Sequence, residues 1–223
     1  MHRRSRTALS VSAALLIAAP LLAACGNEAH PGAAAVVGGE RITVAQLEGR
    51  VNELRDAQRA VTENDEQYAQ LLSEQCDAAL KMETPQPCDP VRGTLHTMVF
   101  ERVVDRVAKD AGIEVTRKEL QTARAQQEKV SGGAEGLERT ALRNNVAPAR
   151  LDDTLRTWML LDKLDRTLGG EELRKAMAEA SDELSIDLNP RYGTWDVKVG
   201  HLGEADTPWL REVTPRLRAD QQA

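Results

Sequence analysis

Apolar residues recur at steps of three and four positions over most of this chain, and this spacing places them on one face of an α-helix. The first such stretch begins after Thr43, a residue type that favours a helix N-cap, and continues to Val61. A polar break over 63–66 precedes a second stretch with the same period, which ends near Lys81 before a proline-rich segment. The pattern therefore predicts amphipathic helical structure on both sides of the break.

Five further helical stretches are predicted, over 91–111, 117–130, 137–145, 148–168 and 171–184. The stretch over 91–111 has apolar residues on two sides, so we expect it to be the central helix. Gly112 marks its end, and Thr116 with Glu119 forms a capping box that opens the next helix. The predicted fold class is mostly α, with a core of about six helices.

Short strands are predicted near both ends of this helical region. Residues 35–37 and 40–42 are interpreted as two short strands around Gly38-Gly39, which is typical of a tight hairpin. Residues 186–188, Ile-Asp-Leu, are also typical of a strand, and Trp195, Val197 and Val199 alternate with polar residues as in one strand. The positions of these segments predict pairing between Val36-Val37 and 186–188.

The N-terminus has the organisation of an export signal. Arg3, Arg4 and Arg6 precede an apolar stretch over 8–24, which Pro20 interrupts and which is short for a membrane span. The stretch ends in Leu-Ala-Ala-Cys-Gly at 22–26, which resembles a bacterial lipobox with Cys25 as the acylated residue. An ordinary secretory signal with an incidental cysteine is the alternative. We expect a protein anchored by lipid, such as palmitate, on the extracytoplasmic face of the cell membrane.

The chain then divides into four predicted parts. They are a signal peptide at 1–24, a tether of small and polar residues at 25–33, a helical domain at 34–202, and a polar tail at 203–223, for which disorder is one interpretation. Loss of the three signal arginines changes the formal charge from −6 to −6 − 3, about −9. An acidic chain of this kind is not expected to bind nucleic acid.

The two cysteines that remain after Cys25 are Cys76 and Cys88, an even pair in an oxidising compartment. Between them, Pro85 and Pro87 force the chain to turn, so we predict a disulfide. Two unrelated thiols are the alternative. Neither cysteine has a second cysteine or a histidine at a metal-ligand spacing.

No catalytic, metal-binding or cofactor-binding motif is found in the sequence, so we expect a protein that is not an enzyme. The histidines are scattered, and His96 is interpreted as a polar helix position. Trp158 and Met159, at helical spacing, are expected in the core and not on a ligand-binding stripe. Residues 189–193 are interpreted as a structural turn in which Tyr192 packs and Arg191 pairs with an acid.

The order of these elements resembles the SurA N-terminal domain family of extracytoplasmic chaperones, which is related to the PrsA-like foldases. The resemblance rests on residues 34–43, 98–104, 112–116, 151–164 and 189–193. It implies a membrane-anchored, ATP-independent chaperone for unfolded or partly folded exported polypeptides. Only Gly169-Gly170 separate Leu168 from Glu171, where family members often insert a parvulin domain. A prolyl isomerase is therefore disfavoured, whereas a dedicated partner of one envelope protein is a further alternative.

Overall fold

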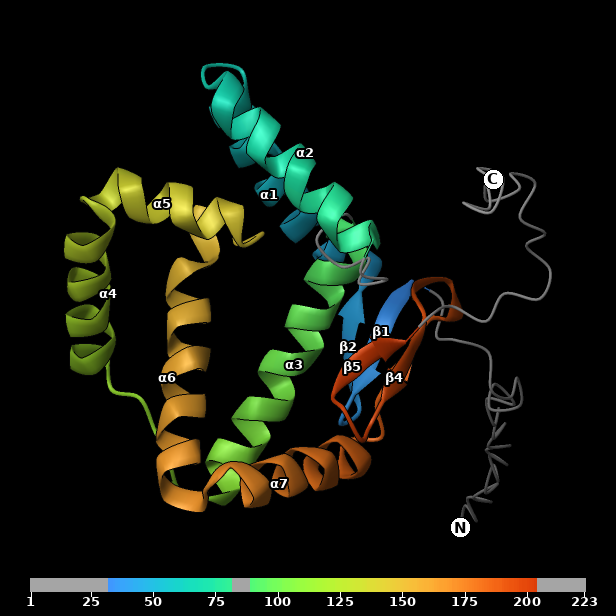
Figure 1. Cartoon of the computed structure of the whole chain (residues 1–223). Coiled ribbons are helices and arrows are strands. Elements are labelled where there is room, and N and C mark those ends of the chain that lie inside the picture. Colours follow the sequence, from blue (N-terminus) through green and yellow to red (C-terminus); the bar gives the residue numbers. More distant parts are fainter. Residues whose placement is uncertain (1–31, 82–88, 204–223) are drawn as a thin grey trace, which may run out of the picture.

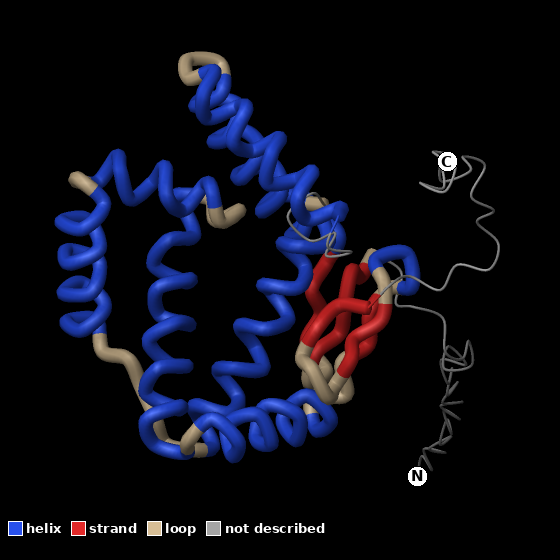
Figure 2. Tube along the Cα trace, viewed as in Figure 1, coloured by secondary structure: helices blue, strands red, loops and turns tan. Residues whose placement is uncertain are grey.

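The computed structural model describes residues 32–81 and 89–203, which are mostly helical with a few short strands (Figures 1 and 2). The helices are α1 (Val44–Thr62), α2 (Glu66–Lys81), α3 (Pro90–Asp110), α4 (Arg117–Ser131), α5 (Ala134–Arg143), α6 (Leu151–Leu168) and α7 (Gly170–Glu183). The strands are β1 (Ala33–Val37), β2 (Glu40–Thr43), β3 (Asp187–Leu188), β4 (Thr194–Asp196) and β5 (His201–Gly203). Two 3-10 turns are η2 (Pro148–Arg150) and η3 (Pro190–Tyr192). The predicted fold class is confirmed.

Several predictions fall on other parts of the chain. The signal peptide with Cys25, most of the tether, Cys88 and the tail beyond Gly203 lie outside the described residues. Over the described ranges, no helix combines the length and the apolar character that a bilayer span requires.

A small sheet joins the two ends of the domain. Its strand order is β2-β1-β3, and β1 pairs antiparallel with β3 through Ala35 with Leu188 and Val36 with Asp187. The predicted pairing between the two ends is therefore confirmed. The turn between β1 and β2 needs glycine at Gly38, because its φ is +60° and a Cβ there would lie 2.8 Å from a methyl group of Leu184.

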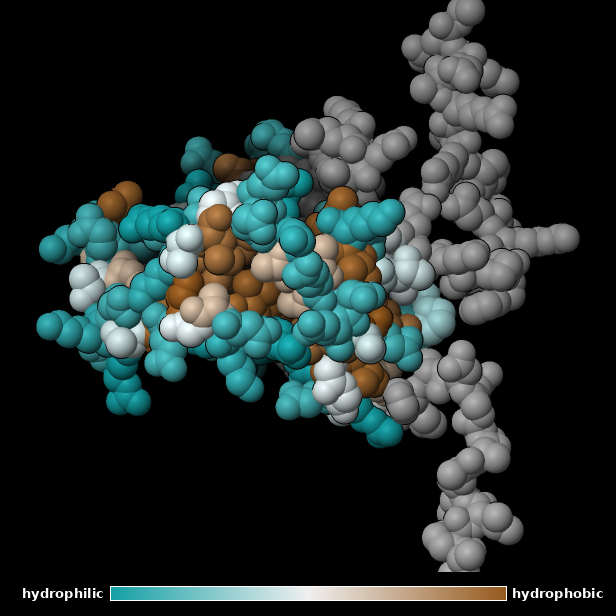
Figure 3. Space-filling view, turned by 90° about the horizontal axis from the view of Figure 1, so that it is seen from below, coloured by the Kyte–Doolittle hydropathy of each residue, from teal (hydrophilic) through white to brown (hydrophobic). Residues whose placement is uncertain are grey.

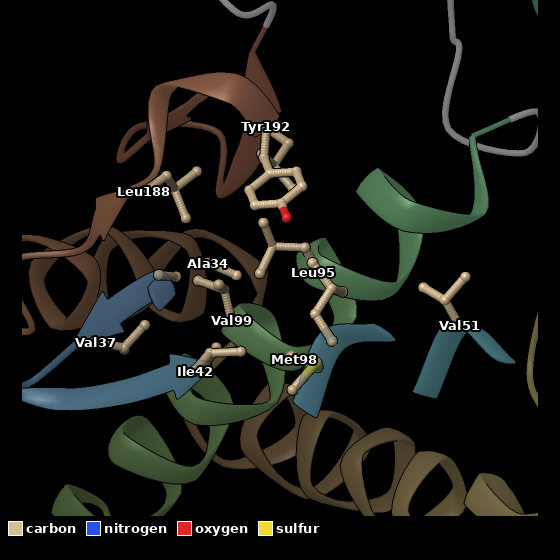
Figure 4. Close-up of a cluster of buried hydrophobic side chains, with 12 residues drawn as sticks. Ala34, Val37, Ile42, Val51, Leu95, Met98, Val99, Leu188 and Tyr192 are labelled. Atoms are coloured by element: carbon tan, nitrogen blue, oxygen red, sulfur yellow. The ribbon is translucent and has the colours of Figure 1, made fainter. Parts of the chain in front are cut away.

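Helix α3 is the centre of the fold, as its two apolar faces predicted. One face packs with α1 and the sheet, where Ile42, Leu95 and Val99 are fully buried (Figure 4). Another packs against α6 and α7 through Val103, Val104 and Val107. Figure 1 shows α3 crossing the middle of the molecule between the sheet and α6, with α7 at their lower ends.

Two smaller units extend from this centre. Helices α1 and α2 form an antiparallel pair that projects beyond the sheet. Helix α4 lies on the far side of α6, and α5 runs across the upper end of α6 toward α1 (Figure 1). Arg124 on α4 pairs with Asp152 on α6 at 2.6 Å, and Lys163 on α6 pairs with Glu119 on α4 at 2.7 Å. These solvent-exposed ion pairs connect α4 with α6.

The prediction of one strand over Trp195–Val199 is wrong in its second half. Only β4 continues to Asp196, and the chain then turns and returns as β5, which pairs antiparallel with β4. The Asp196 carboxylate accepts hydrogen bonds from the backbone N–H groups of Lys198 and Val199, at 2.8 and 3.3 Å. The alternation of valines resembled a strand, but the side chain of an aspartate can stabilise a turn in the same sequence.

Candidate polypeptide-binding groove

Two adjoining hollows follow the accessible side of α3. The larger, of about 500 Å³, lies between α1 and α3 and reaches η2. The smaller, of about 300 Å³, lies between the end of α3 and α6. Both are lined by Asp105, so we treat them as one feature, the α3 groove. Its other lining residues include Ala45, Gly49, Arg50, Glu53, Met98, Glu101, Arg102 and Arg150 in the larger part, and Ala108, Lys109, Gly112, Ile113 and Arg156 in the smaller.

Small residues on α1 leave the larger hollow open. Ala45 and Gly49 line it, and a Cβ added at Gly49 would meet no atom within 4 Å. Along α3 the groove extends from Met98 to Gly112, which at 1.5 Å per residue is about 21 Å. An extended chain of about six residues has that length. The groove is therefore long enough for a short extended polypeptide segment.

Three ion pairs connect the helices that form its walls. Arg50 on α1 donates to Glu101 on α3 at 3.0 Å, and Arg156 on α6 donates to Asp105 on α3 at 2.6 Å. Arg150, at the start of α6, makes two hydrogen bonds of 2.8 Å to the carboxylate of Glu53 on α1. Two parallel bonds fix both the distance and the orientation of the pair. The walls are thus held at set positions by balanced charges.

The carboxylates in the groove differ in their environments. Burial raises the pKa of Glu101, and the opposing effect of the Arg50 guanidinium is smaller. The hydrogen bonds from Arg150 lower the pKa of Glu53, which is largely solvated. Glu101 is therefore the carboxylate whose charge depends most on its partner, because a buried charge is costly without one.

The expectation that Trp158 lies in the core is wrong. Trp158 is 66% exposed, whereas Leu160 and Leu164 on the same helix are fully buried. Successive residues of a helix are about 100° apart, so a residue two positions before Leu160 falls on the opposite side. Leu155 and Leu161, which flank Trp158 at helical spacing, are partly buried. Leu155 and Leu161 pack against buried clusters, so Trp158 is the large apolar side chain of α6 that is left exposed.

Apolar surface is also accessible at the end of the domain where α7 lies. Figure 3 shows apolar residues gathered on this face between charged side chains. Residues of α6 and α7 that pack on the second core and remain partly exposed are Leu161, Leu168, Leu173, Ala176 and Met177. Contiguous apolar surface of this kind often marks an interaction site.

Of the predicted site residues, the structure describes Cys76 but neither Cys25 nor Cys88. Cys76 lies on α2 and is disulfide-bonded. Cys88 lies outside the described residues, so its pairing with Cys76 stays a prediction. The turn at 189–193 is confirmed in part: Tyr192 is buried, but Arg191 lies over the Tyr192 ring, 5.0 Å from its centroid, where an acidic partner was expected.

The sequence did not predict that His96 and His201 lie side by side. His96 was interpreted as a polar helix position, but it is partly buried beside His201, and their ring centroids are 5.0 Å apart. The sequence separation of more than one hundred residues gave no signal of this contact. Over the described ranges, no group of three or more histidine, cysteine or acidic side chains is arranged to hold a metal ion.

Comparison with known families places this geometry in context. A family model described as SurA-like N-terminal domain matches residues 1–165, well over half of the chain. The chain therefore belongs to the SurA-like N-terminal domain family. Neither the curated proteins nor the solved structures contained a match.

Proposed function

We propose that this protein is a membrane-anchored, ATP-independent chaperone-like module that binds unfolded or partly folded exported polypeptides. Membership of the SurA-like family supports a chaperone-like role. The observation that carries the proposal further is Trp158, a large apolar side chain left two-thirds exposed on a helix whose other face is well packed. Tryptophan is enriched where proteins bind other chains.

The α3 groove and the apolar surface of α6 and α7 suit different parts of such a client. The groove has room for an extended segment, and its arginine and carboxylate side chains offer hydrogen bonds to a polypeptide backbone. The surface near Trp158 and the surface on α7 offer contacts to apolar side chains. Neither is a deep enclosed pocket, so binding is expected to be weak and tolerant of sequence.

The lipid on Cys25 would compensate for weak binding of clients. Retention at the membrane raises the local concentration of the module where exported chains emerge, and this increases occupancy without any new contact. Cys25→Ser is expected to release the protein from the membrane, which fractionation and mass spectrometry of the mature N-terminus would measure. An unmodified N-terminus at another residue would contradict the anchor.

The binding proposal is tested by suppression of aggregation. The chain made without residues 1–25 should prevent aggregation of a chemically unfolded exported protein at near-stoichiometric ratio. Trp158→Ala should weaken this effect several-fold. Val130→Ala is the matched control, because Val130 is also an exposed apolar residue, at 73%, but lies at the end of α4.

Failure of the unsubstituted chain to suppress aggregation would contradict a general chaperone and favour a dedicated partner. Equal effects of the two substitutions would contradict the role of Trp158. The proposal also includes the absence of catalysis, and acceleration of proline isomerisation in a peptide assay, in proportion to protein concentration, would overturn that part.

A further inference from the structure

Four aromatic rings join the β4–β5 hairpin to α3. His96 and Phe100, one turn apart on α3, stack with their centroids 5.7 Å apart and an interplanar angle of 15°. The His96 ring also meets Trp195 of β4 at 5.7 Å and His201 of β5 at 5.0 Å. His96 is thus the ring that contacts all three others.

Other contacts also hold this hairpin, and Leu202 of β5 is buried in the core that α3 shares with α1 and the sheet. The Nε2 atom of His96 lies 3.2 Å from the carbonyl oxygen of Gly200, and Arg92 on α3 donates to the carbonyl oxygen of Gly203 at 2.6 Å. Trp195 packs partly buried against both main cores, and its indole Nε1 is buried without a hydrogen-bond partner among the described residues. His96 is therefore one of several groups that attach the hairpin, and it lies at the centre of the ring contacts.

The charged groups around His96 do not favour its protonation. On α3 the nearby cation is Arg92, which is engaged with Gly203. On β5 the facing group is His201, which disfavours a second positive charge. On β4 the carboxylate of Asp196 is exposed and accepts bonds from its own turn. The Gly200 carbonyl, which favours the charged ring, is the opposing contribution.

We propose that protonation of His96 weakens the docking of the β4–β5 hairpin on α3, so that the hairpin acts as an acid-sensitive cover. Charging His96 places a cation among three rings and beside a second imidazole, and the cation regains its hydration only when the hairpin moves away. The released state accepts the proton more readily than the docked state.

The direction of the pH effect follows from the His96 pKa, which burial lowers and His201 lowers further. Above about pH 6.5, the ordinary histidine value, both states are neutral and docking is unaffected. Below that pH the released state binds the proton first, so docking weakens by up to tenfold for each pH unit until the docked state also titrates.

Release of the hairpin would expose Phe100 and Trp195. This apolar surface would then add to the surface available to clients, a consequence that rests on the proposed function. Release itself does not, because it concerns only contacts within the chain.

Hydrogen exchange of the full chain in detergent tests the proposal. Between pH 6.5 and pH 5, after correction for intrinsic exchange, protection of the amides over 194–203 should fall about tenfold, while α3 and α6 stay protected. His96→Phe keeps an aromatic ring and should remove the pH dependence. His201→Phe is the matched control and should retain it, since His96 still titrates.

Unchanged protection over 194–203 in the native chain, or the same pH dependence in His96→Phe, would overturn the proposal. If His96→Phe does not fold, the titration of the His96 ring by NMR decides, because a midpoint at or above 6.5 would also overturn it. Binding of a labelled unfolded polypeptide at both pH values is a separate readout. If the hairpin is released at low pH but client affinity stays constant, the acid-sensitive release is upheld. Only the proposed effect of release on client binding is then contradicted.

Discussion

Trp158→Ala separates a binding residue from a structural one. If Trp158 serves client binding and not the core, its removal should cost little stability. Its 66% exposure leaves about one third of the side chain in contact with the protein.

The expected loss can be worked from that fraction. A tryptophan side chain has up to about 250 Å² of surface, so about 85 Å² is buried at Trp158. At about 25 cal/mol per Å² this is about 2 kcal/mol, which is an upper estimate. Alanine is the better helix former by about 0.5 kcal/mol. The free energy of unfolding should therefore fall by no more than about 1.5 kcal/mol, whereas a buried tryptophan would cost about 3 to 5 kcal/mol.

Urea denaturation followed by circular dichroism measures this difference. Leu164→Ala is the control on the same helix, because Leu164 is fully buried between α3, α6 and α7 and should cost about 2 to 5 kcal/mol. A loss of 3 kcal/mol or more for Trp158→Ala would refute the assignment of Trp158 to the surface. A small loss for Leu164→Ala would refute the described core.

Three further predictions concern local structure. Gly193→Ala should lower the free energy of unfolding by about 1 to 3 kcal/mol in the same assay, because φ is +119° and a Cβ would meet the Gly203 carbonyl oxygen. The hydrogen bond from Lys163, with those from Thr116, lowers the pKa of Glu119 to about 2. Its stabilising effect is present above pH 4.5 and declines as the pH falls towards 2, so acid unfolding of Glu119→Gln should show a weaker pH dependence there. Thiol labelling of unreduced protein should leave Cys76 and Cys88 unmodified, and rapid labelling of both would contradict the disulfide.

Local sequence signals predicted most of the helical fold. Thr116 forms the predicted capping box with Glu119, and Thr43, which was predicted as an N-cap, caps α1 in a box with Gln46. The apolar faces of 91–111 predicted that this helix is central, because a helix with two apolar sides needs partners on both. The pairing of β1 with β3 was predictable because both are short strand-like segments that lie at opposite ends of the helical region.

Side-chain exposure and long-range contacts were less predictable. The helical period places Trp158 with Leu155 and Leu161, but it does not say which of several apolar faces the neighbouring helices cover. The packing of α3 determines which face of α6 is buried, because α3 contacts the side that carries Leu160 and Leu164. The ring contacts of His96 depend on a hairpin turn near residue 198. The sequence did not predict this turn, because the alternating valines there are typical of a continuous strand. The α3 groove is open partly because Gly49 has no side chain. The sequence alone could not predict this, because it does not show that Gly49 of α1 faces α3.

Photocrosslinking from intact cell envelopes tests the central claim, that this domain binds many exported polypeptides along the α3 groove. A photoreactive residue at Gly49 would project into open space within the groove, and one at the exposed Glu138 on α5 is the control. The account predicts that position 49 captures a range of exported proteins and that position 138 captures few. Capture of no protein, or of one constant partner, at position 49 would contradict it.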